Sequence, residues 1–483
     1  MVEMTALRPF VRTRLWITTI LVLVLPMLLL GAPSSAQEAQ DRILLHRNGL
    51  RGVAYMPLAV AGAPSSTAPL RGTAIRKFAL DGDGQTNVRG NVYPIDANGD
   101  GSWELLHFNG YRLMRVYRQD GVKLWQISTR DGRVHRTFVH RDTVAVLDVN
   151  GDGRQDIVHC WATGATGAKY LVERDGATGR VIRQITLPGK AGEECQIAAF
   201  KIYGAPGPLI FVSSTAPITE KCKGNFVDTW SMTLVYDVNL VKKWQRVTCS
   251  AGHYVWPVGI APGNTTWAVA VGKYVLGWSG NLYCTLAGFQ NDHVDSIAIA
   301  DLDPYSSNYE IVAAGMSGLR AYRFWEPTQY CRQLWSVSGN VIPSPQYAIM
   351  AELDPTTPGL NVAVRSKDSG HAKEGTYILN NTGRIVAYNS SGVFFPMQNT
   401  NLDGARGTDE LAGAEGFVMD GKGRIRLDDA WYRGLEVLTA AEKQLSRYDK
   451  WTFRPVWFDL DRDGRDEIVT WGRRTMVIGK IGP

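Results

Sequence analysis

A chain of 483 residues is too long for one ordinary hydrophobic core, so it must hold several domains or a repeated unit. Its composition, 45% hydrophobic and 20% charged, is that of a globular protein and excludes a disordered chain or a polytopic membrane protein. The net charge of +6 comes from dispersed residues rather than from a basic run, which argues against nucleic acid as a partner.

Residues 1–36 are typical of a signal peptide. Three arginines precede an apolar stretch from Leu15 to Gly31, and small residues that suit cleavage follow it. The alternative is an uncleaved membrane anchor, because a stretch of this length can just span a thin bilayer. Pro26 and the small residues favour cleavage. We therefore expect residues 37–483 to be secreted, periplasmic or displayed at the cell surface, with no membrane contact beyond the signal peptide.

One pattern recurs along the chain: a loop rich in carboxylates, followed at once by a β-branched apolar segment. Its copies begin at Asp96, Asp148, Asp301, Glu352, Asn401 and Asp459. The intervals are 52 residues between the first two copies, 51, 49 and 58 between the last four, and 153 across the middle. Two eroded copies, near Phe200 and Ala261, divide the middle interval into three steps. The chain therefore contains eight repeats of roughly fifty residues.

A repeat of roughly fifty residues with about four short strands has the size of one blade of a β-propeller. The segments at 112–117, 123–127 and 143–147 alternate in polarity as strands do, and Gln-Asp-Gly and Arg-Asp-Gly turns separate them. The chain after the last loop suffices for only about two strands, so we expect residues 41–95 to close the ring. The sequence thus predicts an all-β, eight-bladed β-propeller, with seven blades as the alternative, in one monomeric domain over residues 37–483.

The clearest loops have the pattern D-x-[DN]-x-D-G-x-x-[DE], which brings oxygen ligands from positions 1, 3, 5 and 9 to one point. The glycine at position 6 permits a sharp bend, and the oxygen set suits calcium. An EF-hand is unlike this pattern, because it has flanking helices and a bidentate glutamate at its twelfth position. We expect about three structural calcium ions; the alternative is acidic turns without an ion. The predicted ligands are Asp96, Asn98, Asp100, Glu104, Asp148, Asn150, Asp152, Asp156, Asp459, Asp461, Asp463 and Glu467, with Asp301 and Asp303 in a weaker loop.

This loop pattern on this period resembles the FG-GAP/VCBS class of calcium-bearing propellers, over nearly the whole chain after the signal peptide. A more particular stretch contains Asp120-Gly-Val-Lys-Leu124-Trp125, His140, the loop at Asp148 and the run Lys169–Gly179, in that order. It is similar to the run D-G-x-x-L-W, H, D-x-D-G-D-G and Y-L-x-x-x-D-G-x-T-G of the rhamnogalacturonan lyases. This resemblance implies an eight-bladed, calcium-containing propeller and the activity of a polysaccharide lyase.

Three histidines stand eight residues before a loop position, namely His140, His253 and His293. At about 3.3 Å per strand residue, that offset corresponds to about 26 Å and places them on the face of the ring opposite the loops. We expect the three imidazoles to converge near the axis of the propeller. The alternatives are a zinc or copper site, or histidines that only cap strands.

Such a cluster suits β-elimination from a uronate, in which a base removes the proton beside the carboxylate and a cation stabilises the charge that develops. His140 is expected to act as base or acid and Tyr254 to protonate the leaving oxygen, while the others surround the carboxylate. His159 is a secondary candidate because it lies near His140 in the predicted fold; packing between blades is its alternative role. The candidate catalytic residues are His140, His253, His293, Tyr254, Arg365 and His159.

The function predicted from these features is that of a secreted polysaccharide lyase acting on an acidic, pectin-like polysaccharide, with calcium as its structural cofactor. The competing hypothesis is a non-catalytic, calcium-stabilised propeller that binds glycan or protein at the cell surface. No G-x-S-x-G, P-loop or dinucleotide fingerprint occurs in a suitable setting, so hydrolase and nucleotide chemistry have no support.

Six cysteines in an exported chain are compatible with disulfide bonds. The absence of a C-x-x-C pair argues against a zinc site or a thioredoxin-type motif. The pairs Cys195–Cys222 and Cys249–Cys284 are the ones we expect first, although six cysteines allow about fifteen connectivities.

Overall fold

The structure is a computed structural model, and it describes most of the chain after residue 70. The described residues are 71–80, 90–109, 113–128, 133–134, 144–162, 167–190, 195–214, 232–249, 251–252, 255–258, 266–289, 292–306, 309–325, 330–354, 356, 358–366, 374–390, 397–400, 410–413, 418–420, 422, 424–427, 456–471 and 475–482. Within these residues the regular structure is all β-strand. The predicted all-β class is therefore confirmed, while the predicted signal peptide lies outside the described residues.

The described strands form eight antiparallel sheets, in which strands that follow one another along the chain are neighbours. The first sheet contains β2 (Gly90–Ile95), β3 (Glu104–Asn109), β4 (Leu113–Tyr117) and β5 (Lys123–Ser128). The second contains β6 (Arg133–Val134) and β7 (Val144–Leu147), which both pair with β8 (Asp156–Ala162), followed by β9 (Ala168–Arg174) and β10 (Val181–Lys190). The third contains β11 (Cys195–Lys201), β12 (Pro208–Ser214), β13 (Met232–Asp237) and β14 (Lys242–Val247), and the fourth contains β15 (Val255–Val258), β16 (Ala268–Val271), β17 (Tyr274–Leu276) and β18 (Leu282–Thr285).

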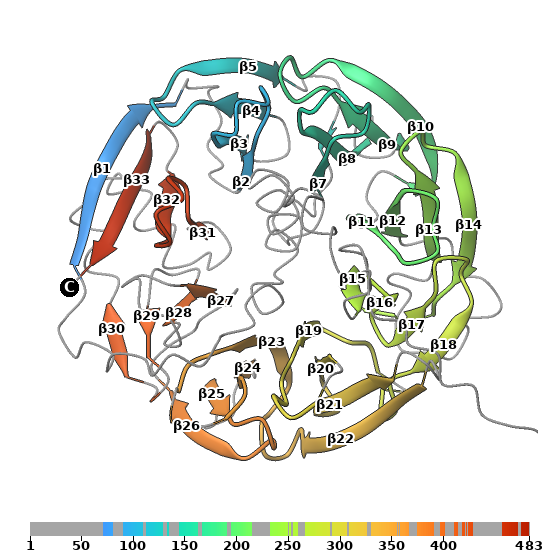
Figure 1. Cartoon of the computed structure of the whole chain (residues 1–483), viewed down its shortest axis with the longest axis vertical. Coiled ribbons are helices and arrows are strands. Elements are labelled where there is room, and N and C mark those ends of the chain that lie inside the picture. The colour runs from blue at the N-terminus through green and yellow to red at the C-terminus, as the bar shows by residue number, and fades with distance from the viewer. Residues whose placement is uncertain are drawn as a thin grey trace, which may run out of the picture.

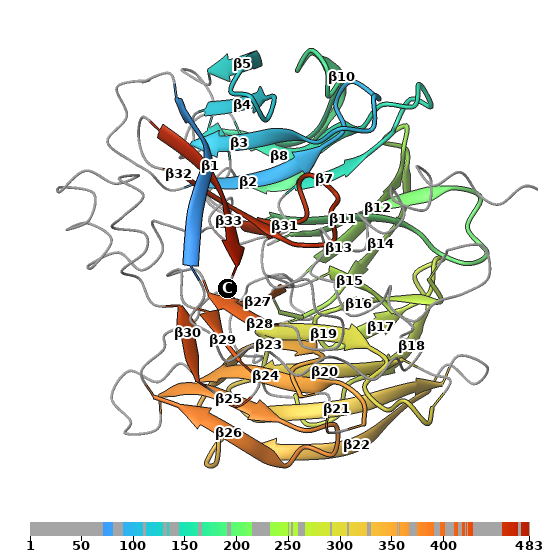
Figure 2. The ribbon, with the colours of Figure 1, turned by 60° about the vertical axis from the view of Figure 1, so that its left-hand side comes forward.

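The other four sheets follow the same order. They are β19 (Ser296–Ala300), β20 (Glu310–Gly315), β21 (Gly318–Trp325) and β22 (Tyr330–Ser338); β23 (Pro345–Ala351), β24 (Asn361–Ser366), β25 (Gly375–Leu379) and β26 (Ile385–Asn389); β27 (Met397–Thr400), β28 (Glu410–Gly413), β29 (Val418–Met419) and β30 (Ile425–Leu427); β31 (Val456–Phe458), β32 (Glu467–Trp471), β33 (Thr475–Gly482) and β1 (Arg71–Ala79). The sheets stand around a common axis, as the blades of a β-propeller do (Figures 1 and 2).

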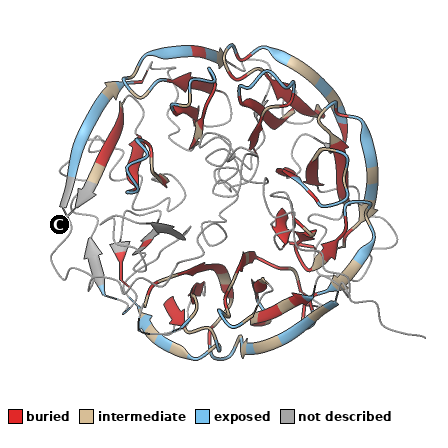
Figure 3. Cartoon of the chain, in the orientation of Figure 1, coloured by how far each residue is buried: buried red, intermediate tan, exposed pale blue. Residues whose placement is uncertain are grey.

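Burial follows the distance of each strand from that axis (Figure 3). The inner strand β7 and the second strand β20 are buried at every position, because neighbouring sheets cover both of their faces. The outer strands β14 and β26 are largely exposed or alternate between half-buried and exposed. The alternation predicted at 112–117 and 143–147 is not seen in burial, because β4 and β7 are buried at every position; the outer strand β26 does alternate.

The last sheet joins both ends of the described chain. Strand β1 pairs with β33 in antiparallel register, from Arg71 opposite Gly482 to Ala79 opposite Thr475. Side chains of this sheet, such as Ile478, pack in one buried cluster with Trp103 and Leu105 of the first sheet. Closing the ring in this way gives the last described sheet a neighbour on each side, which covers the faces that an open array would leave exposed.

Two disulfide bonds connect neighbouring sheets. Cys160 in β8 bonds to Cys195 in β11, and Cys284 in β18 bonds to Cys331 in β22. The expected pairs Cys195–Cys222 and Cys249–Cys284 are therefore wrong, because the bonds join strands that are adjacent in the ring rather than cysteines that are nearest in an intervening loop. Cys249 is also disulfide-bonded, and Cys222 lies outside the described residues.

Candidate functional site

The carboxylate loops lie between the innermost strand and the second strand of their sheets, at one face of the ring. We name them by their first residue: loop 96 (residues 96–104), loop 148 (148–156), loop 301 (301–310) and loop 459 (459–467). All fourteen predicted ligand residues fall in these loops and among the described residues. In each loop the last carboxylate begins the second strand, as in β3, β8, β20 and β32.

Each strong loop folds around its own carboxylates in the same way. In loop 148, Asp148 accepts the backbone N–H groups of Gly151 (2.6 Å) and Gly153 (2.9 Å). Asp156 at position 9 accepts the N–H of Val149 at position 2 (3.1 Å). Loop 96 repeats these bonds at positions 4, 6 and 2, and loop 459 repeats those at positions 6 and 2. The carboxylates at positions 1 and 9 of the sequence pattern are thus the residues that accept hydrogen bonds from the backbone of their own loop.

The glycine at position 6 has the conformation that its predicted role requires. Gly101, Gly153 and Gly464 have φ of 84°, 83° and 89°, in the left-handed region that residues with a Cβ avoid. The bend directs the side chains at positions 1, 3 and 5 inward, so that one oxygen from each of Asp459, Asp461 and Asp463 lies within 4.8 Å of the others.

The carboxylates at position 9 are buried without an adjacent cation in loops 96 and 148. Burial raises the pKa of Glu104 to about 7 and that of Asp156 to about 6, against the lowering effect of their backbone hydrogen bonds. Asp96 is also buried and its pKa is raised by burial. These oxygens are the type of ligand that calcium prefers, and a bound cation would offset the cost of burying them in charged form.

Adjacent loops contact each other around the ring. The backbone N–H of Asp96 donates to Oε1 of Gln155 (3.0 Å), and the N–H of Gln155 donates to the carbonyl of Asp96 (2.9 Å). On the other side of loop 96, the guanidinium of Arg462 lies over the ring of Trp103, 4.8 Å from its centroid. Loops 459, 96 and 148 therefore form a continuous polar surface.

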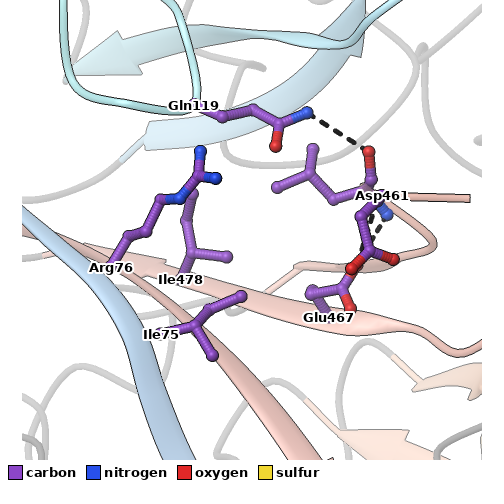
Figure 4. A pocket seen from close by; sticks show the side chains of 7 residues that line it. Ile75, Arg76, Gln119, Asp461, Glu467 and Ile478 are labelled. Atoms are coloured by element: carbon purple, nitrogen blue, oxygen red, sulfur yellow. Dashed lines mark hydrogen bonds between the residues drawn. The ribbon is translucent and has the colours of Figure 1, made fainter. Parts of the chain in front are cut away.

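A small pocket lies beside loop 459, where the last sheet meets the first (Figure 4). Ile75 and Arg76 of β1, Ile478 of β33 and the carboxylates Asp461 and Glu467 line it. Gln119, from the turn between β4 and β5, donates from Nε2 to the carbonyl of Leu460 (3.2 Å). The pocket is a polar notch between two sheets and contains no histidine.

The opposite face holds the described histidine that is best placed for chemistry. His293 precedes β19 and is half-buried, with its Nε2 3.0 Å from Oδ1 of Asp295 and its Nδ1 3.6 Å from Oδ1 of Asp292. Burial disfavours the imidazolium, but the hydrogen bond to Asp295 and the charges of both aspartates outweigh burial and raise the pKa of His293. The ring therefore keeps its proton to a higher pH than an unperturbed histidine does.

A buried network holds Asp292 in place. Its carboxylate accepts the backbone N–H of His293 (2.8 Å) and that of Ser317 (2.7 Å) in the turn between β20 and β21. The ammonium of Lys273 donates to the carbonyls of Phe289 and Asp292, each at 3.0 Å. Sequence reasoning missed Lys273, Asp292 and Asp295, although the acidic residues that flank His293 in the run Asn291-Asp-His-Val-Asp295 were a visible signal.

Arg365 belongs to the next sheet and lies at the same end of the strands. It is next to last in β24 and opposite Tyr347 of β23, and its Nη2 is 3.3 Å from Oε1 of Glu374. The inner strands β19 and β23 are joined through the hydroxyl of Ser296, which donates to the carbonyl of Ala348 (3.1 Å). The structure thus places His293 and Arg365 in neighbouring sheets and at the same face.

Three predicted residues, His140, His253 and Tyr254, lie outside the described residues. The backbone beside one of them is described: Gly252 forms a parallel bridge with Val294. A Cβ at Gly252 would lie 2.0 Å from the carbonyl oxygen of Val294, so this approach requires glycine. The described residues before β15 and before β19 are therefore in direct contact.

His159 makes its described contacts within its own sheet. It is fully buried, and burial together with the charge of Arg174 lowers its pKa to about 3. Arg174 donates from Nε to Nε2 of His159 (2.9 Å), which leaves Nδ1–H facing the carbonyl of Cys160 (3.2 Å). Both ring nitrogens are thus engaged within the fold. His107 in β3 is likewise fully buried, edge-on to Trp471 of the last sheet.

Comparison with known proteins finds similarity in structure alone. No family model matches the chain, and no curated protein matches it in sequence. Three solved structures with a similar fold are the rhamnogalacturonan lyase YesW (TM-score 0.54), the exotype rhamnogalacturonan lyase YesX (0.57) and the Bacillus licheniformis rhamnogalacturonan lyase PL11 (0.57). Each is 16% identical, and each match covers 84% or 85% of this chain and 75% of the other. The chain therefore has a propeller fold like that of polysaccharide lyases.

Proposed function

We propose that this protein is a secreted polysaccharide lyase that cleaves a uronate-containing glycan by β-elimination, on an eight-bladed propeller of the FG-GAP/VCBS type. The observation that carries the proposal is the imidazole of His293, held between Asp292 and Asp295 at the same face as Arg365. A pair of cations suits the carboxylate of a uronate and the negative charge that develops beside it. The similarity in fold to rhamnogalacturonan lyases supports the same reaction class.

The roles follow from charge. The two aspartates beside His293 favour its protonated form, so we assign it to stabilise the enolate-like charge, and His140 or His253 to act as the base. The bridge between Gly252 and Val294 supports a joint role of His253 and His293. Tyr254 protonates the leaving oxygen. Because the pKa of His293 is raised, its positive charge is present below that pKa and is lost as the pH rises through it.

Calcium is proposed as the structural cofactor on the other face. Loops 96 and 148 fit it through the buried carboxylates Asp96, Glu104 and Asp156, which form no ion pair among the described residues, and loop 459 fits it through three converging aspartates. When bound, the ion supplies positive charge that neutralises these carboxylates. The protein groups that orient the ligands are the backbone N–H groups at positions 2, 4 and 6 of the loops.

The test is to incubate the mature protein with pectic and other uronate polymers and to follow the absorbance of unsaturated uronate. The proposal predicts a rise with at least one acidic polymer and none with a neutral polymer. His140→Ala should abolish the rise, while Asp303→Asn, on the loop face, should leave it unchanged. Cleavage by His140→Ala at the wild-type rate would remove the assignment of the base even if lyase activity exists.

One observation favours the second candidate function, a non-catalytic propeller that binds glycan or protein at the cell surface. His293 and Arg365 already have carboxylate partners: His293 has Asp292 and Asp295, and Arg365 has Glu374. Binding of an acidic polymer without any rise in absorbance would establish this function instead.

A further inference from the structure

The carboxylate loops differ in what stands opposite their last ligand across the β-ladder. Glu310, the last ligand of loop 301, is paired in register with Arg323 of β21. Glu467, the last ligand of loop 459, is paired in register with Lys480 of β33. A residue directly opposite in an antiparallel ladder lies on the same face, so each basic side chain is directed toward its loop.

At loop 301 the guanidinium of Arg323 spans the ligand positions. Its Nη2 is 2.6 Å from Oδ2 of Asp303, and its Nε is 2.8 Å from Oε1 of Glu310. The other oxygen of Glu310 accepts the backbone N–H groups of Leu302 and Asp303. A planar guanidinium is always charged and is suited to two carboxylates at once, so Arg323 neutralises Asp303 and Glu310 together. Asp301 at position 1 has no such bond: its Oδ1 is buried without a hydrogen-bond partner among the described residues.

At loop 459 the ammonium of Lys480 contacts three of the four ligand residues. Its Nζ is 2.8 Å from Oδ2 of Asp461, 2.6 Å from Oδ2 of Asp463 and 3.4 Å from Oε1 of Glu467. These oxygens belong to predicted calcium ligands, so Lys480 and a calcium ion in the loop would compete for them. An ammonium is a point charge on a flexible stem that is one-third exposed here. It can therefore withdraw more easily than the guanidinium of Arg323, which is itself 13% exposed and is held by the fully buried Glu310 as well as by Asp303.

In the remaining strong loops no described basic side chain forms an ion pair with the last ligand, although Arg154 of loop 148 pairs with Asp152 at position 5 (3.3 Å). Ile157 is opposite Arg174, so the position across from Asp156 is that of Asp175, which is acidic. At loop 96 the corresponding residue is Arg118, one after Tyr117, but its guanidinium is paired with Asp120 in its own turn. The loops thus differ in the one residue that lies opposite their last ligand, in the third strand of each sheet or directly after it.

We propose that loops 301 and 459 carry a built-in cation, so that loop 301 takes no metal and loop 459 takes one only by displacing Lys480. Loop 459 belongs to the sheet that closes the ring, and Lys480 keeps this loop formed when calcium is scarce. In loops 96 and 148 no described basic side chain forms an ion pair with the last ligand, so an external cation has no such competitor there. This inference concerns calcium binding alone. Its test does not depend on whether the protein has lyase activity.

The experiment is calcium titration of the chelator-treated protein by calorimetry, with thermal unfolding in calcium and in chelator as a second readout. Lys480→Met should bind its weakest ion at least tenfold more tightly than the wild type and should gain more in melting temperature from calcium. Lys242→Met is the matched control, because Lys242 lies on the outer strand β14 and bonds to Gln245. Affinities of Lys480→Met within twofold of wild type, or no calcium binding by this variant, would overturn the proposal.

Two further variants do not depend on Lys480→Met folding. Asp461→Asn should remove the weakest calcium site and leave the tighter ones unchanged; loss of a tight site would contradict the proposal. Asp303→Asn should leave the number of bound ions unchanged, because Arg323 already occupies loop 301. A stoichiometry lower by one ion in Asp303→Asn would show that loop 301 is a metal site.

Discussion

The two faces of the ring hold their charged groups in different ways. On the loop face, carboxylates accept hydrogen bonds from the backbone of their own loop, and the same bonds recur in loops 96, 148 and 459. On the opposite face, His293 is held by Asp292, Asp295 and contacts from other strands, in an arrangement that the described part of the ring does not repeat. A repeated, self-satisfied motif indicates a structural role, whereas a singular charged cluster indicates a site of binding or chemistry.

This comparison predicts that variants of the loop face change stability and variants of the opposite face change activity. The largest effect is expected for Glu310→Gln, since Glu310 is fully buried and bonded to Arg323 and to two backbone N–H groups. We expect the free energy of unfolding to fall by about 3 kcal/mol, because one partner of a buried ion pair is lost. Urea unfolding measures this loss, and the activity per folded molecule should not change.

Asp303→Asn is the control for this prediction, because Asp303 is one-third exposed and should cost less than about 1 kcal/mol. Equal unfolding midpoints for Glu310→Gln and the wild type would show that the pair does not stabilise the loop face.

The next effect is on the other face. His293→Gln removes the cation between Asp292 and Asp295 and should lower the rate on an acidic glycan about 100-fold, or about 2.7 kcal/mol in transition-state stabilisation. The melting temperature should change little, because the imidazole is half-buried and at the surface of the ring. Initial rates and thermal unfolding check both parts. A wild-type rate would contradict the prediction that this face carries the activity. A loss of folding that accounts for the loss of rate would contradict the prediction that this face contributes little to stability.

A smaller effect concerns acid. Burial and then the charge of Arg174 lower the pKa of His159 to about 3 in the folded protein, whereas an unfolded histidine titrates near about 6.5. Below that value the unfolded chain binds one more proton, so stability falls with falling pH by about 1.4 kcal/mol per pH unit. His159→Gln should reduce this slope by one proton, as measured by urea unfolding at several pH values. An unchanged slope would mean that His159 is not the neutral, buried group described above.

The smallest effect is expected for Arg365→Lys, which keeps the charge but not the planar fork that faces Glu374. We expect KM for an acidic glycan to rise about threefold, or about 0.7 kcal/mol, with kcat unchanged, because the contribution of the residue is to binding. Steady-state kinetics separates the two constants. A fall in kcat at constant KM would instead show that Arg365 stabilises the transition state. No change in either constant would show that Arg365 does not belong to the site.

The repeat was the part of the fold that could be read directly from residues. The loop pattern at Asp96, Asp148 and Asp459 is local, because the side chains and the backbone N–H groups that they bind are within nine residues of one another. Strands follow the loops at once for the same local reason. The conformation of these loops is set by contacts between residues close in the chain. The loop positions and the all-β class could therefore be predicted without knowing the tertiary contacts.

Contacts between sheets were decided only by the tertiary structure. The bonds Cys160–Cys195 and Cys284–Cys331, and the register that sets Lys480 opposite Glu467, join residues whose proximity depends on how strands pair and how the ring closes. The raised pKa of His293 has the same origin in part, because Lys273 and the turn at Ser317 hold one of its aspartates from other strands. A fifty-residue period specifies each blade, but a one-dimensional pattern carries no register between one strand and the next, and therefore none of these partners.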